Sequence, residues 1–362
     1  MIAKTETTWR KVKLREVMTT ARVNFEKVKT SEYKRNGLLP IFDQGSDAIA
    51  VYTDDPKAEY KGKSPAILFG DHTLKLKIAE SPFAIGADGI QILEPNENLL
   101  DRKFFYYALK GLKMRSYGYE RHMKYLRELE IAHPNITDQK RIADILSAFD
   151  EKIENNNRIV KTLEEMAQAI FKEWFVNPAG RETLLLELAT FVNGGAFGSI
   201  INRNGHGVPL IKIAELNKGI TDNTEWIDQP VADKYCINDG DLLFSWSGTV
   251  DIFIWATGQA VLNQHIFNVV PKGNYSRGLV YYVLKSKLPF FKQMAGAKAT
   301  TMGHIKKEHL EEQSVVIPRH RNLGVFDDFY KKIILLQLEN KKLASLRDLL
   351  LPKLMSGVLD IN

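Results

Sequence analysis

Two stretches of the chain carry apolar residues at alternating steps of four and three, which is the spacing of a helix that packs along one narrow seam. The first series is Ile142, Leu146, Phe149, Ile153, Asn156, Val160, Leu163, Ala167, Ile170 and Trp174. The second is Phe326, Phe329, Ile333, Leu336, Asn340, Leu343, Arg347 and Leu350. Because this seam is narrower than the apolar stripe of an ordinary surface helix, it is typical of a coiled coil. The pattern predicts long helices from about Thr137 to Phe175 and from about Leu323 to Leu351.

An asparagine interrupts each seam near its middle, and the two interruptions suggest a register. If the helices run antiparallel with Asn156 facing Asn340, apolar positions of one seam meet apolar positions of the other almost throughout. The facing pairs are Ile153 with Leu343, Val160 with Leu336, Leu163 with Ile333 and, as the exception, Phe149 with Arg347. A buried asparagine pair lowers stability but penalises slipped registers. The alternative is that each seam packs only on its own domain.

Short apolar runs separated by turn residues lie ahead of each long helix, and they read as strands of compact mixed domains. In the first half the runs are Leu39–Phe42, Ala48–Tyr52, Ala66–Phe69, Phe83–Ile85 and Ile90–Leu93. In the second half they are Leu210–Ile213, Leu242–Ser245, Ile252–Trp255 and His265–Val270. A shorter helix follows each set, one with Asp101 as its expected N-cap and one near Leu279.

The two halves repeat one another. Phe104–Lys110 resembles Leu279–Lys285, and Ile90–Pro95 resembles Ile266–Pro271. The fold class is therefore α+β: two pseudo-repeated mixed α/β domains separated by two long antiparallel helices that form a coiled coil. The expected division is 1–134, 135–176, 177–318 and 319–362. A helix of about 39 residues reaches about 58 Å, which is enough to separate two binding heads by one turn of duplex, about 34–36 Å.

Composition narrows the class of protein. With 362 residues, 44% hydrophobic and 26% charged, the chain is long enough for two domains with their own cores. The net charge of +6 and the pI near 9.0 favour an anionic partner, although the excess is modest. Cys236 is the only cysteine, which excludes an internal disulfide. The polar start from Met1 to Lys13 and the lack of a long apolar run favour a cytoplasmic protein with no signal peptide or membrane span.

Catalytic motifs are weak. Gly62-Lys63-Ser64 resembles the end of a phosphate-binding loop, but Lys57 stands where the pattern requires glycine. Asp54, Glu59 and Lys61 resemble the carboxylates and lysine of a magnesium-dependent nuclease, although Asp54 lies in a turn where its charge is simply solvated. The histidines have no metal-ligand spacing, and no Asn-Pro-Pro-aromatic methylation motif occurs. Neither a metal nor a cofactor is expected, and a nuclease or a helical scaffold without DNA remain the alternatives.

Basic and aromatic residues gather between the short helix and the long helix of each half, a mixture that suits DNA phosphates and base edges. In the first half they are Lys113, Arg115, Tyr117, Tyr119, Arg121, His122, Lys124, Tyr125 and Arg127. In the second half they are Lys298, Thr300, Thr301, His304, Lys306 and Lys307. Two turns that follow aligned strands are weaker candidates for base contact: Asp71-His72-Thr73 and Trp246-Ser247-Gly248-Thr249. A solvated surface loop is the simpler interpretation for any single residue, but the shared location favours double-stranded DNA as a partner.

The segment from Asn135 through Leu146 to Phe175, and the C-terminal segment from Leu335 to Gly357, resemble the two conserved regions of specificity subunits of type I restriction-modification systems. The resemblance implies a non-catalytic DNA-recognition subunit whose two domains each read one part of a bipartite target while the helices set the gap. It also implies two modification subunits as partners, which would bind S-adenosylmethionine and methylate adenine, joined by restriction and translocase subunits in defence against foreign DNA. The second helix departs from the first, because Pro318–Asn322 contains no counterpart of Gln139.

Overall fold

The computed structural model describes residues 9–21, 27–45, 49, 51–86, 89–116, 118, 120–296, 305 and 307–359. The chain divides into two compact units: the first is Met1–Glu151 with Ala344–Asn362, and the second is Lys152–Leu343. Both boundaries fall inside long helices. Within the described ranges, no helix combines the length and the apolar character needed to cross a lipid bilayer.

Three small sheets form the first unit. A four-stranded antiparallel sheet has the order β2-β8-β5-β6, a three-stranded sheet has the order β4-β3-β7, and β1 pairs with β9. The strands are β1 (Arg10–Lys13), β2 (Met18–Thr20), β3 (Leu39–Phe42), β4 (Val51–Thr53), β5 (Ala66–Gly70), β6 (Leu76–Ala79), β7 (Ala84–Ile85), β8 (Ile90–Pro95) and β9 (Glu130–His133). The helices ahead of the long one are α1 (Leu14–Val17), α2 (Arg102–Lys110) and α3 (Met123–Leu126), with 3-10 turns η1 (Thr30–Glu32) and η2 (Pro56–Ala58).

The second unit repeats this plan. Its antiparallel sheet has the order β11-β19-β16-β17, its second sheet has the order β12-β14-β13-β18-β15, and β10 pairs with β20. The strands are β10 (Gly180–Leu184), β11 (Ala189–Asn193), β12 (Ile201–Asn202), β13 (Val208–Ile211), β14 (Trp226–Ile227), β15 (Cys236–Ile237), β16 (Leu242–Ser245), β17 (Asp251–Ile254), β18 (Ala260–Leu262), β19 (Ile266–Pro271) and β20 (Ser314–Pro318). The helices are α5 (Leu185–Leu188), α6 (Ile213–Lys218), α7 (Arg277–Gly296) and α8 (Lys307–Glu311), with η3 (Asp233–Tyr235).

Corresponding elements make corresponding hydrogen bonds in the two units. The amide of Asn96 donates to Val17 O after β8, and the amide of Lys272 donates to Leu188 O after β19. The order sheet, helix, short helix, strand and long helix is the same in both. The predicted α+β class with an internal duplication is therefore confirmed.

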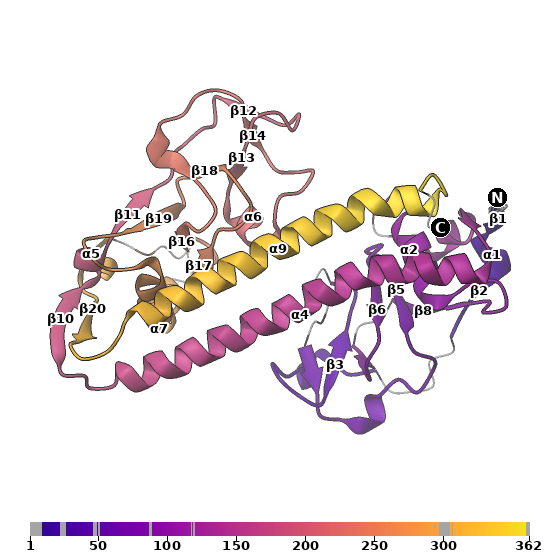
Figure 1. Cartoon of the computed structure of the whole chain (residues 1–362), viewed down its shortest axis with the longest axis horizontal. Coiled ribbons are helices and arrows are strands. Elements are labelled where there is room, and N and C mark those ends of the chain that lie inside the picture. Colours follow the sequence, from indigo (N-terminus) through magenta and orange to yellow (C-terminus); the bar gives the residue numbers. More distant parts are fainter. Residues whose placement is uncertain are drawn as a thin grey trace, which may run out of the picture. The chain divides into compact units, whose positions relative to one another are not determined.

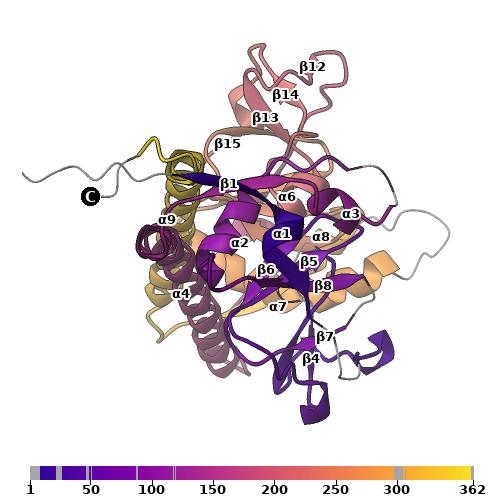
Figure 2. The same ribbon diagram turned by 90° about the vertical axis from the view of Figure 1, so that its right-hand side faces the viewer.

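Helix α2 forms because Asp101 caps it: the Asp101 carboxylate accepts the amide of Phe104 at 2.9 Å. Its aromatic residues are buried, Phe104 and Phe105 completely, in a core that also holds Phe69 of β5 and Leu146 of the long helix. Figure 2 shows α2 on the side of β5, β6 and β8 that faces α4. The predicted N-cap is thus confirmed, and α2 is the layer that joins the sheet to the long helix within this unit.

The long helices are α4 (Ile136–Trp174) and α9 (Gly324–Met355). Gln139 fixes the start of α4, because its side chain is completely buried and bridges two elements. Its Oε1 accepts the amide of Asp101 at 2.8 Å, and its Nε2 donates to Leu99 O and Pro134 O, both at 2.9 Å. One glutamine therefore ties the beginning of α4 to the cap of α2.

Within the second unit, α9 runs antiparallel beside α4, as Figure 1 shows for the two long ribbons. Asn156 Nδ2 donates to Asn340 Oδ1 at 2.9 Å, which is the pairing that the sequence register predicts. Asn156 also donates to Glu339, and Asn340 donates to Asn157. Near the end of α4, Phe326 packs edge-on against Phe171 and Trp174. The seam here is a helix pair centred on a polar network.

In the first unit, the apolar seams of the long helices pack on the globular domain, which is the alternative considered from the sequence. Ile142 and Leu146 of α4 and Leu354 of α9 are buried in the core that contains α2. The guanidinium of Arg347 pairs with Asp150 of α4 and with Asp348. The outer parts of the helices therefore pack on a globular domain, while the central part forms the helix pair.

A tyrosine and a lysine of the helix that follows the main sheet, α2 in the first unit and α7 in the second, secure the long helix in both units. In the first unit, Tyr107 donates to Asp150 at 2.7 Å, and Lys110 lies 3.6 Å from the same carboxylate. Burial, together with the nearby Asp150 charge, raises the pKa of Tyr107, so its hydroxyl stays protonated. In the second unit, Tyr281 and Lys285 both bond to Glu164 of α4, at 2.5 Å and 3.1 Å.

Candidate nucleic-acid interface

The basic segment of the first unit lies between α2 and β9 and surrounds α3. Lys113, Arg115, Arg121 and Lys124 are exposed. Lys124 pairs with Glu120 at 3.0 Å and lies over the Tyr125 ring, 4.7 Å from its centroid. Hydrogen bonding to Glu120 raises the pKa of Lys124, which keeps the ammonium charged. Tyr117 and Tyr119 lie outside the described residues.

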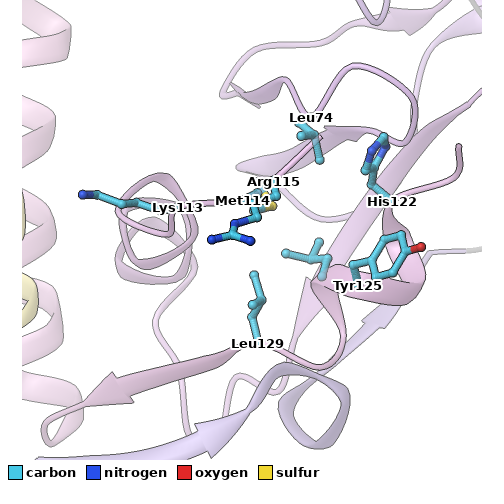
Figure 3. A pocket seen from close by; sticks show the side chains of 8 residues that line it. Leu74, Lys113, Met114, Arg115, His122, Tyr125 and Leu129 are labelled. Carbon is cyan, nitrogen blue, oxygen red and sulfur yellow. The ribbon is translucent and has the colours of Figure 1, made fainter. Parts of the chain in front are cut away.

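A pocket of about 290 Å³ opens beside this segment. Its lining residues are Leu74, Lys113, Met114, Arg115, His122, Tyr125, Leu126 and Leu129. In Figure 3, His122 and Tyr125 stand on one side and the Lys113 side chain points away to the other. The pocket combines an apolar floor with two cationic residues, a mixture that suits contact with an anionic and partly apolar ligand.

His122 does not belong to the exposed set. Only 1% of it is accessible, and its Nδ1 donates to Asp71 O at 2.9 Å because a carbonyl can only accept. Its amide donates to the same oxygen at 2.8 Å. His122 is therefore not accessible for the expected base contact in this structure; the residue anchors the segment to the turn after β5.

The turn after β5 carries Asp71, His72 and Thr73. Asp71 is 3% exposed, and its carboxylate accepts the amide of Met123 at 2.7 Å, so it too is structural. His72 is half-buried: its amide donates to Gln44 Oε1 at 3.1 Å, and its Nδ1 lies 3.2 Å from Glu120 O. Thr73 is exposed. Sequence reasoning missed Gln44, because an amide side chain just after a strand carries no recognisable motif.

The corresponding turn of the second unit carries Trp246, Ser247 and Thr249. Trp246 is half-buried, donates from Nε1 to Asn193 Oδ1 at 3.2 Å, and lies beside the ring of His265 with centroids 5.7 Å apart. Ser247 is 3% exposed and is not accessible for base contact, whereas Thr249 is exposed. The remaining predicted residues lie outside the described residues: Lys298, Thr300, Thr301, His304 and Lys306.

The helix-pair residues divide by burial. Asn156, Ile333 and Leu336 are buried, at 0%, 1% and 5% exposure. The half-buried remainder is Ile153, Val160, Leu163, Asn340 and Leu343. The best-shielded positions of the pair are therefore Asn156 on α4 and Ile333 and Leu336 on α9.

The positions of Asp54, Glu59 and Lys61 do not support the alternative that the chain is a magnesium-dependent nuclease. Asp54 accepts the amide of Leu38 at 3.0 Å and pairs with Lys34 at 2.6 Å, while Glu59 pairs with Lys61. These side chains thus serve a turn and a surface ion pair. Among the residues that the structure describes, no group of three or more histidine, cysteine, aspartate or glutamate residues could hold a metal ion.

Comparison with known proteins gives consistent matches. The family model described as the type I restriction modification DNA specificity domain matches residues 6–165 and again 184–346. The type I restriction enzyme MjaIX specificity subunit of Methanocaldococcus jannaschii is 25% identical over 334 residues, covering 79% of this chain and 75% of that protein. The type I restriction enzyme HindI specificity subunit of Haemophilus influenzae is 22% identical over 393 residues, covering 80% and 83%.

A solved structure supports the fold. The S subunit of a type I restriction-modification system from M. genitalium aligns with a TM-score of 0.55 at 19% identity, covering 100% of this chain and 99% of that one. At this identity the likeness concerns the fold alone. It extends over both repeats and both long helices.

Proposed function

This chain belongs to the family of type I restriction modification DNA specificity domains, and we propose that each of its two domains reads one half of a bipartite, asymmetric DNA target. The chain is a specificity subunit, a DNA-recognition component rather than a catalytic one. The single observation that carries the bipartite proposal is the repeated frame with unlike surface residues, because identical readers would carry identical side chains. For this division we propose domain boundaries near residues 134, 176 and 318.

DNA and the methyltransferase and restriction subunits of a type I system are the partners of such a subunit. We propose that two modification subunits dock along the long helices, which also set the spacing between half-sites. Large apolar side chains exposed on these helices support docking: Ile145, Ile159, Met166, Leu335, Leu346 and Leu349. S-adenosylmethionine would then bind to the modification subunits, and the complex would act in the cytoplasm.

Binding of the target duplex by the assembled complex is expected to weaken steeply as salt rises. Each neutralised phosphate contributes a slope of about −0.9 in log affinity against log salt, so 6 to 10 contacts lower the affinity roughly 10³- to 10⁵-fold between 50 and 200 mM. Fluorescence anisotropy of a labelled duplex at several salt concentrations measures this slope. A flat profile, or no binding, would favour the protein scaffold.

Arg121→Ala is expected to weaken recognition of one half-site only, because Arg121 is exposed in the basic segment of the first domain. The loss corresponds to about 1–3 kcal/mol if the guanidinium contacts a base. Competition between duplexes altered in one half or the other measures the effect. Arg203→Ala is the control, since Arg203 is already paired with Glu225 at 3.0 Å. Equal loss at both halves would contradict the placement.

A further inference from the structure

One backbone hydrogen-bond frame holds a turn at the same place in both domains. The first turn is Gly70–Lys75. The amide of Asp71 donates to Gly89 O, and Asp71 O accepts the amide of His122, both at 2.8 Å. The turn closes on itself, because Leu74 donates to Gly70 O and Gly70 donates to Lys75 O, also at 2.8 Å.

The second turn, Trp246–Thr249, uses the same frame. The amide of Trp246 donates to His265 O at 3.4 Å, and Trp246 O accepts the amide of Ile305 at 2.9 Å. Trp246 therefore takes the place of Asp71. The residues two and three positions before each are the same in both domains, Leu68-Phe69 and Leu243-Phe244.

The side chains within the frame differ completely. Asp71, His72 and Thr73 of the first turn stand where the second has Trp246, Ser247 and Gly248. A frame shared by two domains that carries unlike side chains is what two readers of unlike sequences require, since base edges are distinguished by the donors, acceptors and methyl groups facing them.

The backbone of the first turn is constrained, which helps it to place a side chain against a base. Leu74 has a left-handed backbone, with φ of +59°, a conformation that costs energy in a residue with a side chain and persists only where its surroundings impose it. Gly89 lies so close to the first turn that a Cβ at this position would be 2.6 Å from Gln44 Nε2 and 2.9 Å from His72 Cδ2. An amide oxygen from a distant part of the chain accepts a hydrogen bond from each turn: Gln44 Oε1, two residues after β3, accepts from the His72 amide, and Asn193 Oδ1 of β11 accepts from Trp246 Nε1.

We propose that these two turns select the base sequence, His72 and Thr73 in one half-site and Thr249 in the other, with Gln44 as the positioning residue for His72. This rests on the proposed function. The cations of the basic segment other than Arg121 then have a separate role, because they neutralise phosphates and supply affinity, whereas the turns supply discrimination.

The test maps methylated adenines in cells that carry the complete complex with wild-type chain, His72→Ala, Thr73→Val or Thr249→Val. Wild type should give one bipartite motif. His72→Ala and Thr73→Val should relax the motif in one half by about tenfold per position, the typical loss for one mismatched pair, and Thr249→Val should relax the other half. His206→Ala, an exposed histidine outside both turns, should leave the motif unchanged.

Two further variants test the positioning role of Gln44. Gln44→Glu keeps an acceptor for the His72 amide and should keep the motif, while Gln44→Leu should relax the same half as His72→Ala. A merely structural role would lower complex yield and thermal stability without broadening the motif. If wild type directs a bipartite motif and every turn variant retains it, the turns are not the readers; if wild type directs none, the proposed function itself fails.

Discussion

Arg102→Ala is expected to destabilise the first domain by about 3–5 kcal/mol, the typical effect of removing one partner from a buried ion pair. Arg102 is 8% exposed, and its guanidinium bonds to Glu94 and Glu97 and to Pro65 O at 3.2 Å. The Glu94 side chain is only 18% exposed, so without Arg102 a poorly solvated carboxylate loses its counterion. Thermal or denaturant unfolding of the purified chain measures the loss.

Lys103→Ala provides the matched control for Arg102→Ala. Lys103 is the next residue of α2, and it pairs with Glu80 and Glu151, whose side chains are 46% and 58% exposed. Such solvated pairs contribute about 0–1 kcal/mol. Combining Arg102→Met with Glu94→Gln and Glu97→Gln should recover most of the loss, since no buried charge then remains. Equal small effects of both single variants would show that the cluster is solvated.

The same cluster gives a pH dependence with a definite sign. Hydrogen bonds from Lys63 and Arg102 lower the pKa of Glu97. Its contribution to stability is therefore present above the ordinary carboxyl pKa and is lost as the pH falls through the lowered value. Glu97→Gln should make stability less dependent on pH in the acidic range.

Asn156→Leu combined with Asn340→Leu is expected to raise the free energy of unfolding by about 1–3 kcal/mol, the cost of a buried polar atom without a partner. Asn156 is fully buried, and its Oδ1 has no hydrogen-bond partner among the described residues. Glu339 loses one donor but stays 44% exposed beside Lys152. The midpoint of thermal unfolding should rise by about 2–4 °C for each kcal/mol.

Specificity of register should fall as stability rises, because leucine tolerates slipped pairings that leave asparagine facing hydrocarbon. Cysteines introduced at Ile153 and Leu343, with Cys236→Ser, should crosslink more heterogeneously in the double leucine variant. Asn155→Leu is the control: Asn155 is exposed, so its change should fall within about 0.5 kcal/mol. A large loss of stability in the double variant would mean that the pair stabilises the helices.

Periodicity predicted the long helices well because a seam of steps of four and three extends over many turns. The structure begins α4 at Ile136 and ends it at Trp174, against an expected Thr137 to Phe175. The ends of the strands were predicted less accurately. The run Leu210–Ile213 is a strand only to Ile211, because Ile213 begins α6, where Glu215 accepts the amide of Lys212.

Charge pattern located the candidate interface but could not separate exposed from buried residues. Arg121 and His122 are neighbours with the same polar character, yet one is exposed and the other is 1% accessible. The difference arises from Asp71, which is 51 residues from His122. Gln44 and Asn193 escaped notice for the same reason, since their partners are distant in sequence.

The turns and the helix attachments share no hydrogen bond among those described above. The turns bond to Gly89, Met123, His265 and Ile305, whereas the long helix is secured through residues of α2 and α7 such as Lys110 and Lys285. Under the proposed role of the turns, substitutions there would change the DNA sequence that a domain recognises and would leave the attachment of that domain to the long helices unchanged. With this arrangement, point mutations in the turns could create new target sequences without an intermediate variant that fails to assemble.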